Sequence, residues 1–200
     1  MANVDRTRGL RPVKYQSGAA WNGQVNEYVV YSGEVSGLWI GDLAVLDGTA
    51  DTLGRPGVEQ LVNIVSGPTI GVVVGFAANP NNLNIGGSFR NSNATTDNRI
   101  VYIVDDPNVI FEIQADSAMD FADVGYYADI TVSIAGSTTT GLSGMELDAS
   151  SVIAAGTSSD RLLLLIQAST MGDNEVSNDS GKWLVKINPR KHQGVGAGIV

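Results

Sequence analysis

Residues 99–114 read Arg-Ile-Val-Tyr-Ile-Val-Asp-Asp-Pro-Asn-Val-Ile-Phe-Glu-Ile-Gln. Two runs rich in β-branched and aromatic residues, Arg99–Asp105 and Val109–Gln114, flank Asp106-Pro107-Asn108. β-Branched and aromatic side chains favour strands, whereas Asp, Pro and Asn favour turns. The stretch therefore predicts a β-hairpin.

Similar runs of about five to nine residues recur along the chain between Gly, Pro and Asn clusters. They are Glu27–Tyr31, Leu38–Leu46, Val58–Val65, Ile70–Phe76, Ile130–Ile134, Leu162–Gln167 and Trp183–Ile187. The connection Ser66–Thr69 predicts a second hairpin. Only Asp116–Ala122 has a helical pattern, of one or two turns. We predict an all-β fold: a single β-sandwich or barrel, jelly-roll-like, with extended N-terminal and C-terminal arms and at most one short helix.

The charges are divided unevenly along the 200 residues, whose net charge is −9. Residues 15–181 carry four basic and twenty acidic side chains, a net −16, whereas the two ends together carry +7. We therefore divide the chain into an extended N-terminal arm (1–20), a β-rich body (21–188) and a C-terminal tail (189–200). Basic ends on an acidic body indicate docking to a partner.

The partner-binding residues predicted on this basis belong to the N-terminal arm and its anchor. They are Arg6, Arg8, Arg11, Pro12, Lys14 and Trp21. Gly9 and Pro12 oppose a regular helix, so the arm is expected to be extended and to contribute little to the core. Arginine suits such a contact because its planar fork can bind a carboxylate through two hydrogen bonds. Deleting residues 2–14 would then leave the body folded.

Candidate catalytic groups are few. The only histidine, His192, lies in a basic tail, where a solvated side chain is expected rather than a triad member. Asp116, Asp120 and Asp123 would share a face of a helical turn, but a solvated acidic face is favoured over a metal or acid–base site. Trp39 and Trp183 are expected in the core or a subunit interface. We predict a protein that is not an enzyme and has no cofactor or metal.

Composition narrows the class further. The chain has no cysteine and hence no disulfide or thiolate metal site. We expect no membrane span, no signal peptide and production in a cytosol. The acidic body argues against nucleic-acid binding, because phosphates would be repelled.

Several stretches, taken in order along nearly the whole chain, resemble head proteins of tailed bacteriophages, in particular the capsid decoration (cement) family. The stretches are Met1–Val13 (MANVDRTRGLRPV), Gly41–Leu43 with Leu46–Ala50 (LDGTA), Gly71–Phe76 (GVVVGF), Val101–Pro107 with Phe111–Gln114, Ser137–Gly141 (STTTG) with Ser143–Asp148 (SGMELD), and Lys182–Asn188 (KWLVKIN).

The resemblance implies a structural virion protein, made in the host cytoplasm, that binds the outside of a phage head. It implies bridging of major capsid protein subunits and self-association as a homotrimer. Another minor head protein and a glycan-binding or glycan-hydrolysing virion component remain as alternatives. A cytosolic β-barrel enzyme is disfavoured by the lack of a usable nucleophile. The Asn79–Asn98 loop and the C-terminal tail are further candidates for the docking element.

Overall fold

A computed structural model of the protein describes residues 3–34, 36–62, 69–78, 89–90, 98–132, 134–154 and 161–192. Nearly all regular structure in these residues is β. The strands are β1 (Arg11–Tyr15), β2 (Asn26–Val30), β3 (Leu38–Trp39), β4 (Leu43–Ala50), β5 (Pro56–Gln60), β6 (Thr69–Phe76), β7 (Phe89–Arg90), β8 (Arg99–Val104), β9 (Val109–Gln114), β10 (Tyr127–Thr131), β11 (Glu146–Ile153), β12 (Leu163–Ala168) and β13 (Lys182–Ile187). A 3-10 helix, η1, covers Phe121–Asp123.

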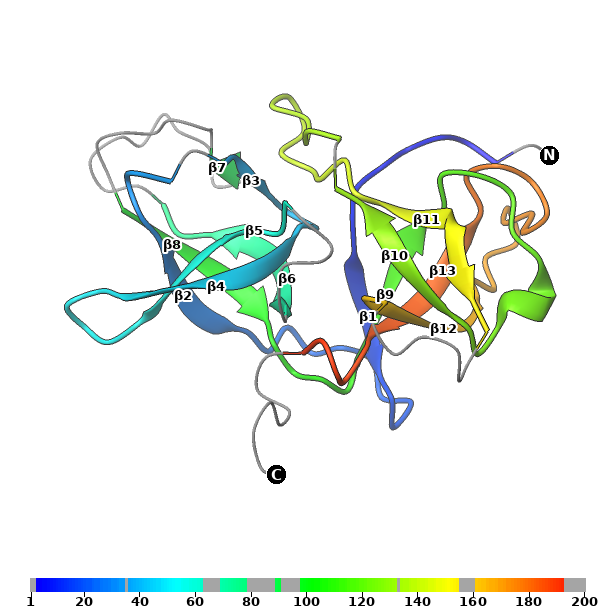
Figure 1. The fold of residues 1–200 in the computed structure, drawn as a ribbon, viewed down its shortest axis with the longest axis horizontal. Helices are drawn as coiled ribbons and strands as arrows, with labels where there is room; N and C mark the ends of the chain where they lie inside the picture. The colour runs from blue at the N-terminus through cyan, green and yellow to red at the C-terminus, as the bar shows by residue number, and fades with distance from the viewer. Residues whose placement is uncertain are drawn as a thin grey trace.

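The strands form two main sheets that lie side by side (Figure 1). One is a closed barrel in the order β2-β5-β4-β6-β8, and the other is a six-stranded sheet in the order β1-β9-β13-β12-β10-β11. A small third sheet pairs β3 with β7. The predicted all-β class is confirmed. The barrel is inserted between β1 and β9, which pair directly with Arg11 opposite Glu112.

The predicted hairpin over residues 99–114 is wrong in its pairing. β8 pairs with β2 and β6 in the barrel, whereas β9 pairs with β1 and β13 in the other sheet. The turn residues do form a turn, since the Asn108 N–H donates to Asp106 Oδ1 at 2.8 Å. The turn carries the chain from one sheet to the other instead of folding it back on itself.

The second predicted hairpin is also wrong, because β5 and β6 lie on opposite sides of β4 and do not pair with each other. Part of its expected connection, residues 63–68, lies outside the described residues. In both cases the strands are where the residue types predict them, but their partners are distant in sequence.

One hydrophobic cluster joins the two sheets. It contains Leu43 and Val72 from the barrel together with Phe111 and Trp183 from the six-stranded sheet. A second cluster fills the barrel around residues such as Val30 and Ile103. Burial of this shared apolar surface holds the two sheets together.

The N-terminal segment lies directly against the barrel where Gly9 and Gly41 approach each other. The Leu10 N–H donates to Gly41 O at 2.9 Å, and the Gly41 N–H donates to Val73 O at 2.8 Å. A Cβ added to Gly41 would lie 2.1 Å from Arg8 O, and Gly41 has φ +100°. Only glycine permits both this conformation and this approach of the two backbones.

The division into an arm and a body needs correction at the N-terminus. The segment is extended as expected, but residues 11–15 are a strand of the six-stranded sheet, and Leu10 is 2% exposed. The alternation of inward-facing and outward-facing side chains that would mark this strand in the sequence is interrupted by a β-bulge between Pro12 and Lys14. The described part of the predicted arm, residues 3–20, therefore largely belongs to the body.

The described part of the predicted C-terminal tail, residues 189–192, is also attached to the body. The Thr69 N–H donates to Lys191 O at 2.6 Å, which ties residues 189–192 to the barrel strand β6. Residues 193–200 lie outside the described residues. The predicted helical turn over Asp116–Ala122 is shorter and later, at Phe121–Asp123.

Candidate partner-binding site

Two of the predicted arginines bind a carboxylate of their own chain. Arg11 Nη2 lies 2.8 Å from Glu112 Oε1, and Arg8 Nη2 lies 3.4 Å from the same oxygen. Ser169 Oγ donates to the other oxygen, Oε2, at 3.0 Å. The Glu112 side chain is 5% exposed, whereas those of Arg8 and Arg11 are 39% and 42% exposed. The two arginines thus neutralise a buried charge and still present part of each guanidinium to solvent.

The remaining predicted residues have different surroundings. Arg6 is exposed, and its side chain has no ion-pair partner in the described part of the chain, while its backbone N–H donates to Gln114 Oε1 at 2.9 Å. Pro12 lies opposite Phe111 in the sheet, and the backbone of Lys14 forms an isolated β-bridge with that of Ala20. Arg6, Arg8 and Arg11 therefore form a partly exposed basic strip, held in place by β9.

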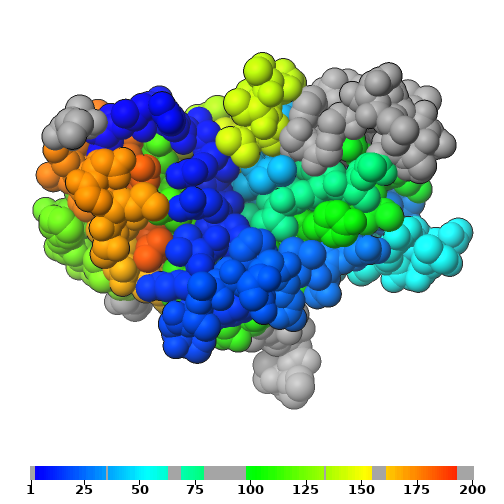
Figure 2. All heavy atoms as spheres, turned by 180° about the vertical axis from the view of Figure 1, so that it is seen from behind, coloured from blue at the N-terminus to red at the C-terminus, as the bar shows by residue number. Residues whose placement is uncertain are grey.

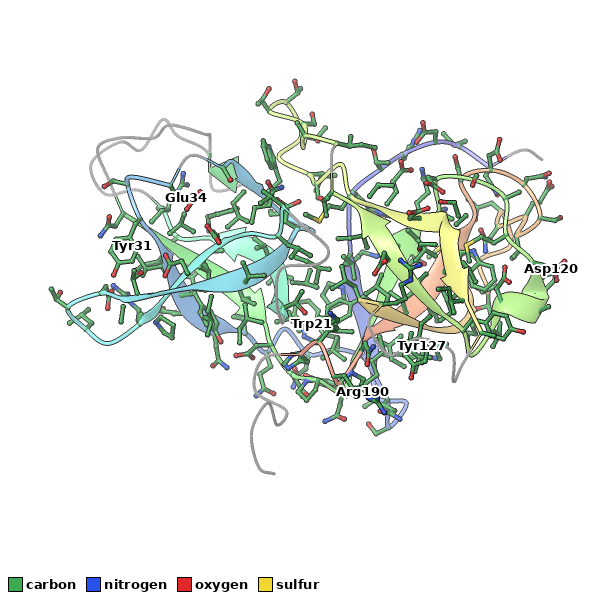
Figure 3. The ribbon with its side chains drawn as sticks, viewed as in Figure 1. Trp21, Tyr31, Glu34, Asp120, Tyr127 and Arg190 are labelled. Atoms are coloured by element: carbon green, nitrogen blue, oxygen red, sulfur yellow. The ribbon has the colours of Figure 1, made fainter. Side chains whose placement is uncertain are left out.

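Trp21 anchors the end of the N-terminal segment, as its position after the basic residues suggested. Its backbone N–H donates to Val13 O at 3.0 Å, and its side chain packs against the shared core. Figure 3 shows it between the two sheets, whereas Asp120 lies at the outer end of the six-stranded sheet. Its position makes it a structural anchor rather than an exposed contact.

Glu112 is a buried, paired carboxylate that the sequence analysis missed. The available signal was a charged residue in the middle of an otherwise apolar run, Val109–Ile113. A charge in such a place is usually paired in the fold. Its two arginine partners lie more than 100 positions away, so sequence alone did not identify them.

We expect Glu112→Gln to lower the free energy of unfolding by about 1–2 kcal/mol, because it weakens charge-assisted hydrogen bonds to two arginines. Urea unfolding would measure the loss. The matched control is Glu27→Gln, whose 52% exposed carboxylate lies 3.3 Å from Arg55. Exposed ion pairs of that kind contribute about 0.5 kcal/mol or less. Equal losses in the two variants would contradict the structural role of Glu112.

A second missed acid, Asp42, is fully buried at the junction of the two sheets. Its Oδ2 accepts hydrogen bonds from the Trp39 N–H at 2.9 Å and from Gln60 Nε2 at 2.8 Å. The Ser143 hydroxyl lies near the carboxylate, but Oδ1 has no hydrogen bond of normal geometry to a described residue. Burial raises the pKa of Asp42 to about 6, and the hydrogen bonds offset only part of that effect.

His192 differs from the solvated side chain that was expected. It is 4% exposed, and neither ring nitrogen forms a hydrogen bond of normal geometry with a described residue. Burial lowers the pKa of His192, although Asp105 opposes this effect. Asp105 also accepts hydrogen bonds from Tyr28 and Asn26. This histidine is therefore a buried neutral side chain against the barrel.

The three aspartates of the predicted helical turn have local structural roles. Asp120 caps η1 by accepting from the Ala122 N–H, and Asp123 Oδ2 accepts from the Asp120 N–H at 2.8 Å. Asp116 Oδ1 accepts from the Ala149 N–H at 3.0 Å. Among the described residues, no group of three or more His, Asp or Glu side chains has an arrangement suited to holding a metal ion.

Two of the three tryptophans present almost no surface to solvent. Trp39 is 7% exposed and Trp183 is 0% exposed, which confirms their expected place in the core. Neither can serve as an exposed platform for a sugar ring. Nearly all of the predicted Asn79–Asn98 loop lies outside the described residues; of its interior only the backbone of β7 is described.

No protein-family model matches the chain, and no curated protein or solved structure resembles it closely enough to count as a match. In the described ranges, no helix is both long enough and apolar enough to cross a membrane. The candidate site therefore has to be interpreted from its own residues.

Proposed function

We propose that this chain is a structural virion protein that binds the outside of a phage head and stabilises it by bridging major capsid protein subunits. The observation that carries the proposal is the basic strip of Arg6, Arg8 and Arg11, held in a fixed position on an otherwise acidic chain. The ordered resemblance to phage head proteins, described above, supports the same assignment.

The geometry suits attachment because the strip is already ordered in the free protein. A disordered arm would lose conformational entropy when it docks, whereas a strand fixed to β9 has already been ordered during folding. The exposed parts of Arg8 and Arg11 remain free to contact a partner carboxylate at the same time as Glu112, since a guanidinium has five N–H donors. Preorganisation of this kind favours a tight, specific contact.

Self-association is part of the proposal. A homotrimer would present three copies of the strip in one closed assembly, because cyclic symmetry satisfies identical interfaces. Three linked copies of the same contact bind more strongly than a single copy, although no new type of interaction is added. Light scattering on the same samples gives the number of copies.

The proposal is tested by adding the purified protein to heads that lack it and sedimenting the mixture. We expect saturable binding, a higher temperature of head rupture, and weaker attachment as salt rises, since surface charges are screened over about 8 Å at physiological ionic strength.

Arg6→Glu should weaken binding strongly, because it reverses an exposed charge in the strip. The matched control Arg190→Glu reverses an exposed charge elsewhere and should bind normally. Heads that bind none of the wild-type protein would exclude the proposed function.

A further inference from the structure

The N-terminal segment and Lys182, the first residue of β13, line one groove of about 710 Å³. The groove is lined by the N-terminal segment Asn3–Arg8 and by residues that include Thr140, Leu142 and Lys182. Figure 2 shows the N-terminal segment (dark blue) crossing this face between the loop at residues 137–142 (yellow-green) and the segment before β13 (orange). The groove therefore combines residues from three distant parts of the chain.

The cations in this groove are loosely paired. Arg8 Nη2 lies 3.4 Å from Glu112 Oε1, and Lys182 Nζ lies 3.7 Å from Asp173 Oδ2. Both distances exceed the usual 2.7–2.9 Å or so of a strong charged hydrogen bond. Arg6 has no ion pair among the described residues. These groups keep most of their donor capacity for a ligand.

The acids that line the groove do not cancel this charge. Asp5 accepts a hydrogen bond from Gln114 Nε2 at 2.9 Å, and Asp173 is 68% exposed to solvent. Three cations and two acids line the groove, and part of the charge of Arg8 is taken by Glu112 behind it, so the groove is far less acidic than a chain whose net charge is −9. The contrast in charge selects an anionic ligand.

The backbone of the N-terminal wall is also available. Residues 4–8 run as a long open arc over the six-stranded sheet (Figure 1). Within the described part of the chain, Arg6 is the only one of them whose backbone N–H has a hydrogen-bond partner. Unpaired donors and acceptors along an extended segment form a template to which another strand can add.

We propose that this groove binds an extended acidic peptide segment of a partner protein. Its backbone would pair with residues 4–8, its carboxylates would contact Arg6, Arg8 and Lys182, and its apolar side chains would contact Val4 and Leu142. Val4 is 61% exposed, which leaves it free for such a contact. A nucleic acid fits less well because the rest of the chain repels phosphates. The inference deepens the proposed function, since the segment would belong to the capsid protein.

The test uses a fluorescein-labelled octapeptide of alternating Thr and Glu, and anisotropy measured on the full chain without heads. We expect saturable binding that weakens about tenfold or more when every Glu is replaced by Gln. A peptide that alternates Pro and Glu keeps the charge but loses half of the backbone donors, so it should also bind more weakly. Equal binding of the Glu and Gln peptides would overturn the proposal.

The double variant Arg6→Gln, Lys182→Gln should weaken peptide binding about tenfold, while Arg190→Gln, the control outside the groove, should leave it unchanged. Equal weakening by the control would show a non-specific charge effect and overturn the inference. Tighter binding of an oligothymidylate at the same residues would assign the groove to a nucleic acid instead. If the protein binds the peptide but not the heads, the peptide-binding groove stands and the head function is excluded. If it binds the heads but not the peptide, only the peptide-binding groove is excluded.

Discussion

Removal of residues 2–14 is expected to unfold the protein. The deletion removes nearly all of β1, the neighbour of β9, together with the buried Leu10. Loss of a buried leucine side chain alone costs about 2.7–5 kcal/mol. The deletion also removes both arginines from the buried Glu112 carboxylate. The combined loss exceeds about 5 kcal/mol, which is the whole stability of many domains.

Far-ultraviolet circular dichroism and urea unfolding would measure this effect. The matched control is a deletion of residues 2–5, which removes the Asn3 contacts to Glu175 but leaves Leu10, β1 and both arginines in place. We expect the shorter deletion to fold with a reduced midpoint. A folded 2–14 deletion with an unchanged spectrum and midpoint would restore the interpretation of this segment as a separate arm.

Asp42→Asn is expected to stabilise the protein by roughly 3 kcal/mol at neutral pH, because a shift of about two pKa units corresponds to that free energy. The folded state holds the Asp42 proton with a pKa of about 6, against 3.8 for the ordinary group. Ionised Asp42 therefore penalises folding fully above about pH 6, and the penalty disappears as the pH falls below about 4. Asparagine keeps an oxygen for Trp39 and Gln60 and places an amide at the unpaired position.

The measurement is the free energy of unfolding of both proteins from pH 4 to pH 8. The advantage of the asparagine variant should be largest above pH 6 and should shrink steadily toward pH 4. The matched control is Asp173→Asn, the same change at a 68% exposed carboxylate. An advantage for Asp42→Asn that is constant with pH would show that Asp42 is not a buried titrating group.

The candidate site was only partly predictable. Clusters of basic residues near both ends of the sequence indicated a docking role, and the structure places Arg6, Arg8 and Lys182 in one groove. Glu112 and Asp42 were visible as charges inside apolar runs, yet nothing in the sequence showed which cations or amides would face them. Partners more than 100 positions apart, as Arg8 and Glu112 are, meet only after the sheet has formed.

Two side chains near the ends of the sequence are buried for the same reason. Leu10 and His192 lie near the ends of the sequence, where exposed segments are common. Leu10 is buried because Gly9 and Gly41 let the N-terminal segment lie directly on the barrel. His192 is buried because residues 189–192 are tied to β6. Position in sequence did not determine exposure; packing against the barrel did.

Most of the strands and turns could be predicted from the sequence, because those preferences depend on the side chain and its immediate neighbours. The exceptions include β1 and β11, which no predicted run covered. It placed β8, the turn at residues 106–108 and β9 correctly. That β8 joins a barrel and β9 a second sheet became clear only from the three-dimensional structure. Strand pairing depends on apolar burial and backbone hydrogen bonds between distant segments. These contacts are formed only when the whole chain has packed.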